Sequence, residues 1–203
     1  MLPHLPNTPR AARTLSTDLA IVAALVGLNV AARLLPHAPH QGAFGRAIDF
    51  TPVAATALFA ASVLRVRALS VVVPLVGMIL ADAWLGFYDP RIMAAVYGML
   101  ALPACAAWLS SRLRRPVMIV PVLLSSSLSF FLVTNFAVWA FSPMYTANAG
   151  GLLKCYIAAL PFLQNALCGD LFWGIVLFGG YWLAQNVRAA KHDVHRAVVA
   201  RAC

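Results

Sequence analysis

Long apolar runs separated by short arginine-bearing connections most constrain what this 203-residue chain can fold into. A helix needs about 20 consecutive apolar residues to cross the hydrocarbon core of a bilayer. The chain is 62% hydrophobic and 10% charged, whereas a typical soluble domain is about 25% charged. We therefore predict an all-α, polytopic membrane protein with the lipid bilayer as its surroundings. The apolar runs cover residues 19–35, 50–64, 68–87, 92–110, 117–141 and 151–185.

The positive charges predict how these runs cross the membrane. Cytoplasmic connections of membrane proteins are enriched in Lys and Arg. If every run crosses and the last region crosses once, both termini are cytoplasmic and most positive charges face the cytoplasm; a re-entrant run 50–64 or a terminal hairpin would break this pattern. We therefore predict a six-helix, multi-pass membrane protein with both termini in the cytoplasm. The charges placed inside are residues 10, 13, 65, 67, 112, 114, 115, 188, 191, 196 and 201; those outside the pattern are Arg33, Arg46, Arg91 and Lys154.

The same pattern divides the chain into segments. A cytoplasmic segment, 1–18, precedes the membrane domain, 19–187, and a basic tail, 188–203, follows it. The last span is expected over 170–186, after an external amphipathic helix over 151–168 that Pro161 should kink. This external helix could serve as a lid over a site or as an interfacial anchor, and both interpretations stay open. The first run lacks a convincing signal-peptide cleavage site, so we expect it to be retained as a helix.

Several function classes find no support in the sequence. The net charge of +9 is spread over short clusters, which indicates topology and not a nucleic-acid-binding face. No Cys or His spacing matches a metal site, and His192 and His195 are better explained as part of a solvated basic tail. No motif of a metalloprotease, serine hydrolase or phosphate-binding loop is present, so no cofactor and no enzymatic activity are predicted. Cys155 and Cys168 could form a disulfide or be small packing residues.

Polar and aromatic residues gather at the predicted outer ends of the helices and indicate an outward-facing binding pocket. Asp82 lies near the outer end of the third run. A charged residue in a membrane-spanning segment is energetically costly, and such residues usually have a function. Three simpler explanations remain: an aromatic belt at the interface, aspartates as helix N-caps, and an Asp82 carboxylate that reaches the lipid headgroups or pairs with Arg91. An acidic, aromatic pocket would suit a cationic or amide-rich ring ligand. The candidate ligand-binding residues are Asp82, Trp84, Tyr88, Asn135, Trp139, Asp170, Asn165, Asp49 and Thr51.

The first apolar run carries a different pattern. Ala20, Ala24, Gly27 and Ala31 place small residues about four apart, a spacing that allows close helix approach. Alanine is common in this chain, so chance explains the pattern equally well.

Four stretches within residues 49–173 carry a resemblance to known proteins: DFTPVAATALFAA, ADAWLGFYD, TNFAVW and GLLKCYIAALPFLQNALCGDLFW. Through them the chain resembles a family of uncharacterised bacterial membrane proteins described as transport proteins, which is similar to the substrate-binding S components of energy-coupling-factor (ECF) vitamin transporters. The chain has Asp49 where the family favours asparagine.

The resemblance implies a six-helix bundle in the bacterial inner membrane that binds a micronutrient, such as a vitamin or a cobalamin-like compound, on the outside. It also implies that Ala20 and Ala24 contact a coupling module made of a transmembrane subunit and ATPases.

Two hypotheses follow. The first is a membrane subunit that binds a small molecule for uptake, with the ligand entering from the periplasm. The alternative is a non-transporting scaffold or assembly protein that binds the transmembrane helices of a partner. In that case the polar residues would hold helices together.

Overall fold

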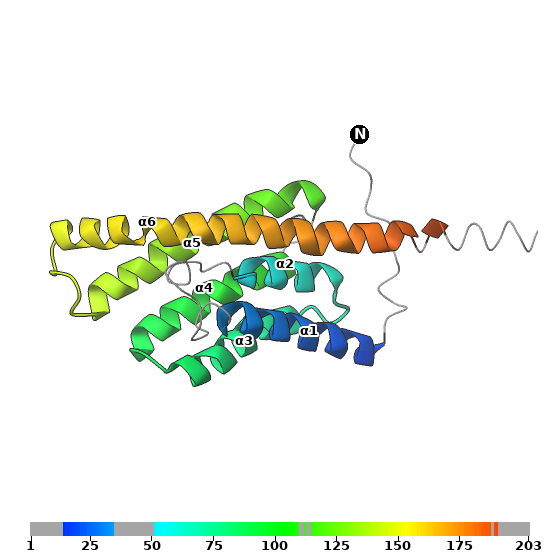
Figure 1. Cartoon of the computed structure of the whole chain (residues 1–203), viewed down its shortest axis with the longest axis horizontal. Helices are drawn as coiled ribbons and strands as arrows, with labels where there is room; N and C mark the ends of the chain where they lie inside the picture. The colour runs from blue at the N-terminus through cyan, green and yellow to red at the C-terminus, as the bar shows by residue number, and fades with distance from the viewer. Residues whose placement is uncertain (1–13, 35–50, 110–111, 113–114, 188, 191–203) are drawn as a thin grey trace, which may run out of the picture.

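The computed structural model describes residues 14–34, 51–109, 112, 115–187 and 189–190. Within these ranges helices are the only regular elements, which confirms the all-helical prediction. The helices pack into an elongated bundle, with α6 running along its whole length (Figure 1). They are α1 (Leu15–Leu34), α2 (Val53–Val63), α3 (Leu69–Leu85), α4 (Pro90–Leu109), α5 (Pro116–Phe141) and α6 (Ala149–Gly174), which continues through a π-helical segment (Ile175–Gly179).

The helices have lengths and apolar compositions that are typical of membrane proteins. Four helices in the described part of the chain are long and apolar enough to cross a bilayer: Leu15–Leu34, Pro90–Leu109, Val117–Phe141 and Ala149–Val187. Helix α2 has 11 residues and α3 has 17, so α2 rises only about 16 Å at 1.5 Å per residue. Because the hydrocarbon core is about 30 Å thick, the six-span count stays a prediction.

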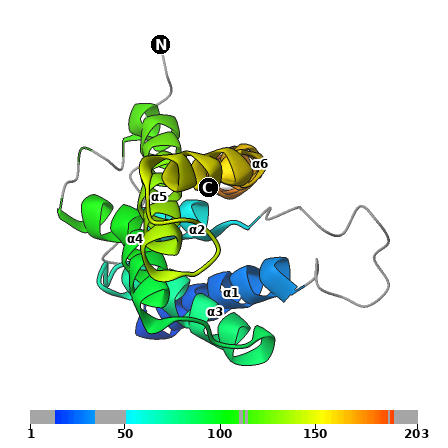
Figure 2. The same ribbon diagram turned by 90° about the vertical axis from the view of Figure 1, so that its left-hand side faces the viewer.

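Helix α2 is a short, inner element of the bundle. Pro52 precedes it, and a proline fixes φ and supplies no backbone N–H. Most residues of α2 are buried, and Figure 2 shows the helix among α1, α3, α4, α5 and α6. The polar ends of a short helix are tolerated at membrane depth when protein surrounds them.

A polar contact fixes α1 against α2 and α3. The Asn29 amide donates to the Thr56 hydroxyl oxygen over 3.0 Å, and both side chains are buried. A Cβ atom on Gly77 would lie 2.9 Å from the Cβ of Asn29, so glycine is what lets α3 approach α1 this closely.

The bundle has two distinct ends. At one, which we call the Asp18 end, the Asp18 carboxylate accepts hydrogen bonds from the backbone N–H groups of Arg65 (3.0 Å) and Val66 (3.2 Å). Asp18 was expected in the segment before the membrane domain, but α1 begins at Leu15 and buries it. At the other, the Asp82 end, Arg33 lies 3.9 Å from Asp82. Consecutive helices alternate in direction between the two ends.

The long C-terminal helix corrects one prediction. The external helix expected over 151–168 is not a separate element, because Ala149–Val187 forms one helix of 39 residues. At 1.5 Å per residue this helix is about 58 Å long, which exceeds the about 40–45 Å of a whole bilayer. Its N-terminal part is held to α5, because the Tyr156 hydroxyl donates to the Leu132 carbonyl over 2.8 Å.

The two cysteines of this helix are free thiols. They lie thirteen residues apart on one helix, which separates them by about 20 Å, whereas a disulfide needs Cα atoms within about 7 Å. Cys155 is buried and its Sγ donates to the Asn135 carbonyl over 3.4 Å. Packing is therefore its role here.

Candidate functional site

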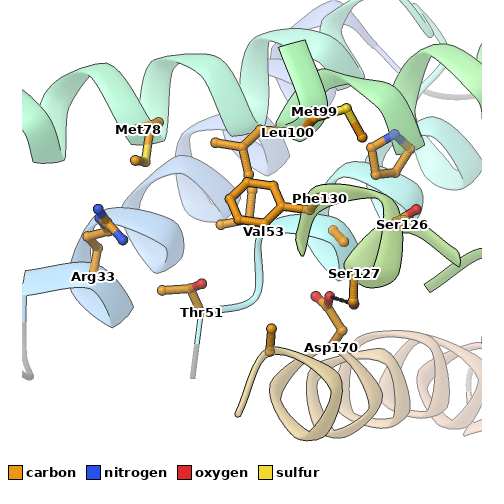
Figure 3. A pocket seen from close by; sticks show the side chains of 13 residues that line it. Arg33, Thr51, Val53, Met78, Met99, Leu100, Ser126, Ser127, Phe130 and Asp170 are labelled. Carbon is orange, nitrogen blue, oxygen red and sulfur yellow. Dashed lines mark hydrogen bonds between the residues drawn. The ribbon is translucent and has the colours of Figure 1, made fainter. Parts of the chain in front are cut away.

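A cavity of about 80 Å³ lies inside the bundle, between the Asp82 end and the apolar interior of the Asp18 end. Residues from all six helices and from the segment just before α2 line it, and Figure 3 shows their side chains. The lining residues are Arg33, Thr51, Val53, Ala54, Met78, Met99, Leu100, Pro103, Ser126, Ser127, Phe130, Ala166 and Asp170.

One side of the cavity carries a carboxylate. Asp170, on α6, is only 7% exposed. The Ser127 hydroxyl of α5 donates to Asp170 Oδ2 over 2.6 Å, a length typical of a charge-assisted O–H···O bond. A buried carboxylate among membrane helices usually marks a functional site.

The opposite side carries a guanidinium. Arg33, near the end of α1, enters the cavity from the side away from Asp170 (Figure 3). Its Nη2 lies 3.9 Å from Asp82 Oδ1, and the Tyr97 hydroxyl donates to Asp82 Oδ2 over 2.8 Å. Asp82 therefore lies behind Arg33 and helps to orient it.

Tyr88 lies close to this charged group. Partial burial, followed by the negative charge of Asp82, raises the pKa of Tyr88, whereas the positive charge of Arg33 lowers it. The phenol therefore stays protonated and can donate a hydrogen bond at neutral pH.

The walls between the two charges are mostly apolar and polarisable. Phe130 occupies the middle of the view in Figure 3, with Met78, Met99 and Leu100 around it. Pro103 lies inside α4 and has no N–H for the Met99 carbonyl, four residues earlier. The cavity wall thus includes a place where the helical hydrogen-bond ladder is interrupted.

Apolar side chains close the bundle between the cavity and the Asp18 end. The Phe59 ring packs edge-to-face against Phe178 (5.4 Å between centroids) and Tyr181 (5.7 Å). A second buried cluster around Leu58 and Leu123 joins α2 to α4 and α5. The two clusters therefore form the apolar part of the interior on this side of the cavity.

The structure brings together only some of the residues that the sequence suggested. Thr51 and Asp170 line the cavity. Asn165 is half-buried on α6 and precedes Ala166, which does line it. Asp82 is buried behind Arg33. Asp49 lies outside the described residues.

Three aromatic or amide residues lie elsewhere. Trp84 is 81% exposed and faces the surroundings. The Asn135 amide donates to the Phe131 carbonyl of its own helix over 2.8 Å. The Trp139 indole N–H donates to the Thr146 carbonyl over 3.0 Å, and so ties the end of α5 to the turn before α6.

The structure also decides how Asp82 is paired. The alternative that placed Asp82 beside Arg91 is wrong, because Arg91 bonds Asp89 instead (Nη2 to Oδ2, 2.8 Å). The Arg91 guanidinium also lies over the Phe141 ring, 4.7 Å from its centroid. Asp89 and Arg91 therefore form a local pair at the start of α4, away from the cavity.

Sequence reasoning missed Arg33, Ser126, Ser127 and Phe130. The signal for the serines was available, since three consecutive serines, 125–127, interrupt an apolar run. Arg33 stood out only as an exception to the charge pattern. This departure from the charge pattern was the sequence signal that Arg33 acts inside the bundle.

No metal centre accompanies the cavity. Within the described ranges, no three His, Cys, Asp or Glu side chains come close enough to hold a metal ion. His192 and His195 lie outside those ranges.

Comparison with known proteins places the chain in a family. No curated protein and no solved structure matches it. One family model matches residues 13–192, which is most of the chain. The protein therefore belongs to a family of unknown function (DUF6580).

Proposed function

We propose that this protein is the substrate-binding membrane subunit of an uptake transporter in the bacterial inner membrane. The observation that carries the proposal is the cavity, which has Arg33 and Asp170 in a lining that is otherwise mostly apolar. Charged residues at membrane depth usually mark substrate or ion pathways. Concave sites with an apolar wall and a few polar groups are typical of small-molecule binding.

The arginines orient the proposed transporter. Arg65 and Arg67 belong to the turn at the Asp18 end, and Arg112 and Arg115 to the connection between α4 and α5. The positive-inside rule then places the Asp18 end in the cytoplasm and the Asp82 end outside. The ligand would reach the cavity from the periplasm. Its release to the cytoplasm would require the helices to move so that the apolar cluster of Phe59, Phe178 and Tyr181 no longer blocks the way.

An ECF-type coupling module fits one exposed surface. Ala20, Ala24, Gly27 and Ala31 are all exposed on α1. Among the described residues, nothing outside the surrounding turns of α1 lies within 4 Å of the position that a Cβ atom on Gly27 would take. Small residues let another helix approach closely. In the proposal, Ala20 and Ala24 contact the transmembrane subunit, and the ATPases drive the release step.

The size of the cavity limits the ligand. Sites for drug-sized molecules enclose about 300–1,000 Å³, whereas this cavity encloses about 80 Å³. A vitamin-sized or cobalamin-like ligand would therefore require the bundle to open. A compact ligand fits the bundle as it stands.

The same exposed face of α1 also favours a second candidate, a scaffold that binds the transmembrane helix of a partner. The two functions differ in what purifies with the protein. We would isolate it from membranes of its native host and analyse the extract for small molecules and the complex for proteins. A defined small molecule together with ATPase subunits supports the transporter; an envelope protein with no small molecule supports the scaffold and refutes the transporter.

A further inference from the structure

The charges of the cavity define the class of its ligand. Resting on the proposed function, we propose that the ligand is a compact zwitterion whose cationic nitrogen lies beside Asp170 and whose anionic group lies beside Arg33. The two side chains come from different helices, α6 and α1, and enter the cavity from different sides (Figure 3). Thr51 and Phe130 lie between them in that view.

A ligand with one charge would meet an unfavourable group in this cavity. A carboxylate that pairs with Arg33 would share a confined space with Asp170 and lie near Asp82, so it needs a cationic nitrogen of its own beside Asp170. A lone cation would face Arg33, whose charge Asp82 offsets only in part from 3.9 Å. Taking a charge out of water is favourable only when an opposite charge and hydrogen bonds replace the hydration. A zwitterion oriented from Asp170 to Arg33 meets that condition at both of its ends.

The Asp170 side of the cavity is built for a cation. Ser127 bonds one carboxylate oxygen, Oδ2, at 2.6 Å, and an ionised carboxylate accepts several hydrogen bonds. The Phe130 ring lies nearby in the lining, where an aromatic face attracts a cationic nitrogen. Both primary and quaternary ammonium groups suit these surroundings.

The Arg33 side is built for an anion. Asp82 and Tyr97 form a buried group behind the guanidinium, and a guanidinium presents five N–H donors in a planar fork that matches a carboxylate. The first residues of α2, Val53 and Ala54, line the same cavity. Helix α2 begins at Val53, and its N-cap residue, Pro52, supplies no side-chain cap, so the positive end of the helix dipole also favours a negative charge there.

Size narrows the class further. A cavity needs about 10–15 Å³ to hold one water molecule. A cavity of about 80 Å³ therefore holds several waters or one small solute. We expect ligands of about ten non-hydrogen atoms or fewer. Small amino acids and betaines fall in this class, whereas nucleotides and peptides do not.

Matched compounds test the proposal on the purified, full-length protein in detergent. Three zwitterions are used: glycine betaine, proline and β-alanine. Each is compared with an analogue that lacks the carboxylate (choline, pyrrolidine, ethylamine) and one that lacks the cationic nitrogen (3,3-dimethylbutyrate, cyclopentanecarboxylate, propionate). We expect at least one zwitterion to raise the unfolding temperature by several degrees at millimolar concentration, and its two analogues to have no effect.

Variants assign the two charges. Asp170→Asn keeps a group that can accept from Ser127 but removes the negative charge, and Arg33→Gln removes the positive charge; each should weaken binding of the effective zwitterion at least tenfold. Arg33→Lys should retain part of the binding because it keeps the charge. Asp89→Asn, outside the cavity, should bind like the wild type. The unfolding temperature of each variant without ligand checks that it is folded.

The outcomes separate this inference from the proposed function. Any of three results would overturn the proposal that the ligand is a zwitterion: equal binding of a single-charge analogue, no response to any of the nine compounds, or unchanged binding in both charge variants. If a neutral molecule then purifies with the protein, the transporter proposal survives alone. If no small molecule purifies with it and none of the compounds binds, both fail.

Discussion

The two ends of the bundle bury the same kind of side chain for different purposes. At the Asp18 end, a fully buried carboxylate accepts two backbone N–H groups and so caps the turn between α2 and α3. Around the cavity, Asp82 and Asp170 are held by side-chain hydroxyls, from Tyr97 and Ser127. Backbone partners fix a carboxylate in one arrangement, whereas hydroxyl partners can rotate.

Ser127 illustrates what that difference permits. Its single hydroxyl proton has two acceptors within reach, Asp170 Oδ2 at 2.6 Å and the Leu123 carbonyl at 3.1 Å. When a ligand occupies Asp170, the hydroxyl can turn to the carbonyl without being left unpaired. Hydrogen-bond partners around the cavity can therefore change at a low cost in free energy, whereas the backbone partners of Asp18 cannot. Substitutions at the Asp18 end should change stability, and substitutions around the cavity should change binding.

The largest expected effect is on the apolar cluster of the Asp18 end. Phe59→Ala removes a buried ring that contacts Phe178 and Tyr181, and should lower the free energy of unfolding by about 4 kcal/mol. Denaturant unfolding in detergent measures it, with Leu80→Ala on the exposed face of α3 as the control. A loss no larger than that of the control would contradict the packing described here.

Asp18→Ala should have the next largest effect, a loss of about 3 kcal/mol, because two backbone N–H groups lose a charged, fully buried acceptor. Asp18→Asn should lose less, since its amide oxygen can accept in the same place. Denaturant unfolding measures the loss of stability in both variants, and the ligand affinity of the folded fraction should stay unchanged. Weaker binding in these variants would break the division between the two ends.

Tyr97→Phe should act mainly on binding. It removes the hydrogen bond to Asp82 and loosens the group that positions Arg33, so stability should fall by about 1–2 kcal/mol and ligand affinity severalfold. Tyr156→Phe is the matched control, because it removes a hydroxyl bond of equal length, 2.8 Å, and neither Tyr156 nor its acceptor Leu132 lines the cavity. Similar affinity in the two variants would show that Tyr97 has only a structural role.

The smallest effect is expected at Asp89. The side-chain hydrogen bond from Arg91, followed by one from its backbone, lowers the pKa of Asp89 from 3.8 to about 2. A lowered pKa stabilises the fold above the unfolded value and ceases to do so as pH falls toward 2. The small difference in unfolding temperature between wild type and Asp89→Asn should therefore be constant from pH 5 to 8 and shrink below pH 4. A difference that changes between pH 5 and 8 would contradict the pairing.

The sequence predicted the helices well because hydropathy decides where they form. It divided Ala149–Val187 in two because Gly169 and Asp170 resemble a helix start. In the structure Asp170 lies within one continuous helix, and its side chain accepts a hydrogen bond from Ser127 of α5. A helix-start pattern cannot reveal which neighbouring helix a side chain faces.

The site was harder to predict for the same reason. Asp170 and Thr51 were recognised from their residue types, and both line the cavity. Arg33 and Ser127 approach it from helices distant in sequence, and only helix packing brings them there. Trp84 and Trp139 were suggested by their proximity to the polar residues along the chain, yet each faces other surroundings.

Native mass spectrometry of the protein released from its own membranes tests the central claim, that the cavity holds a small molecule, most directly. Ala166→Phe places a large side chain in the cavity wall, and Ala158→Phe places the same side chain on an exposed position of the same helix. We predict a discrete small-molecule adduct on the wild type and on Ala158→Phe, and none on Ala166→Phe. An adduct of the same mass and occupancy on all three proteins, or on none, would contradict the account.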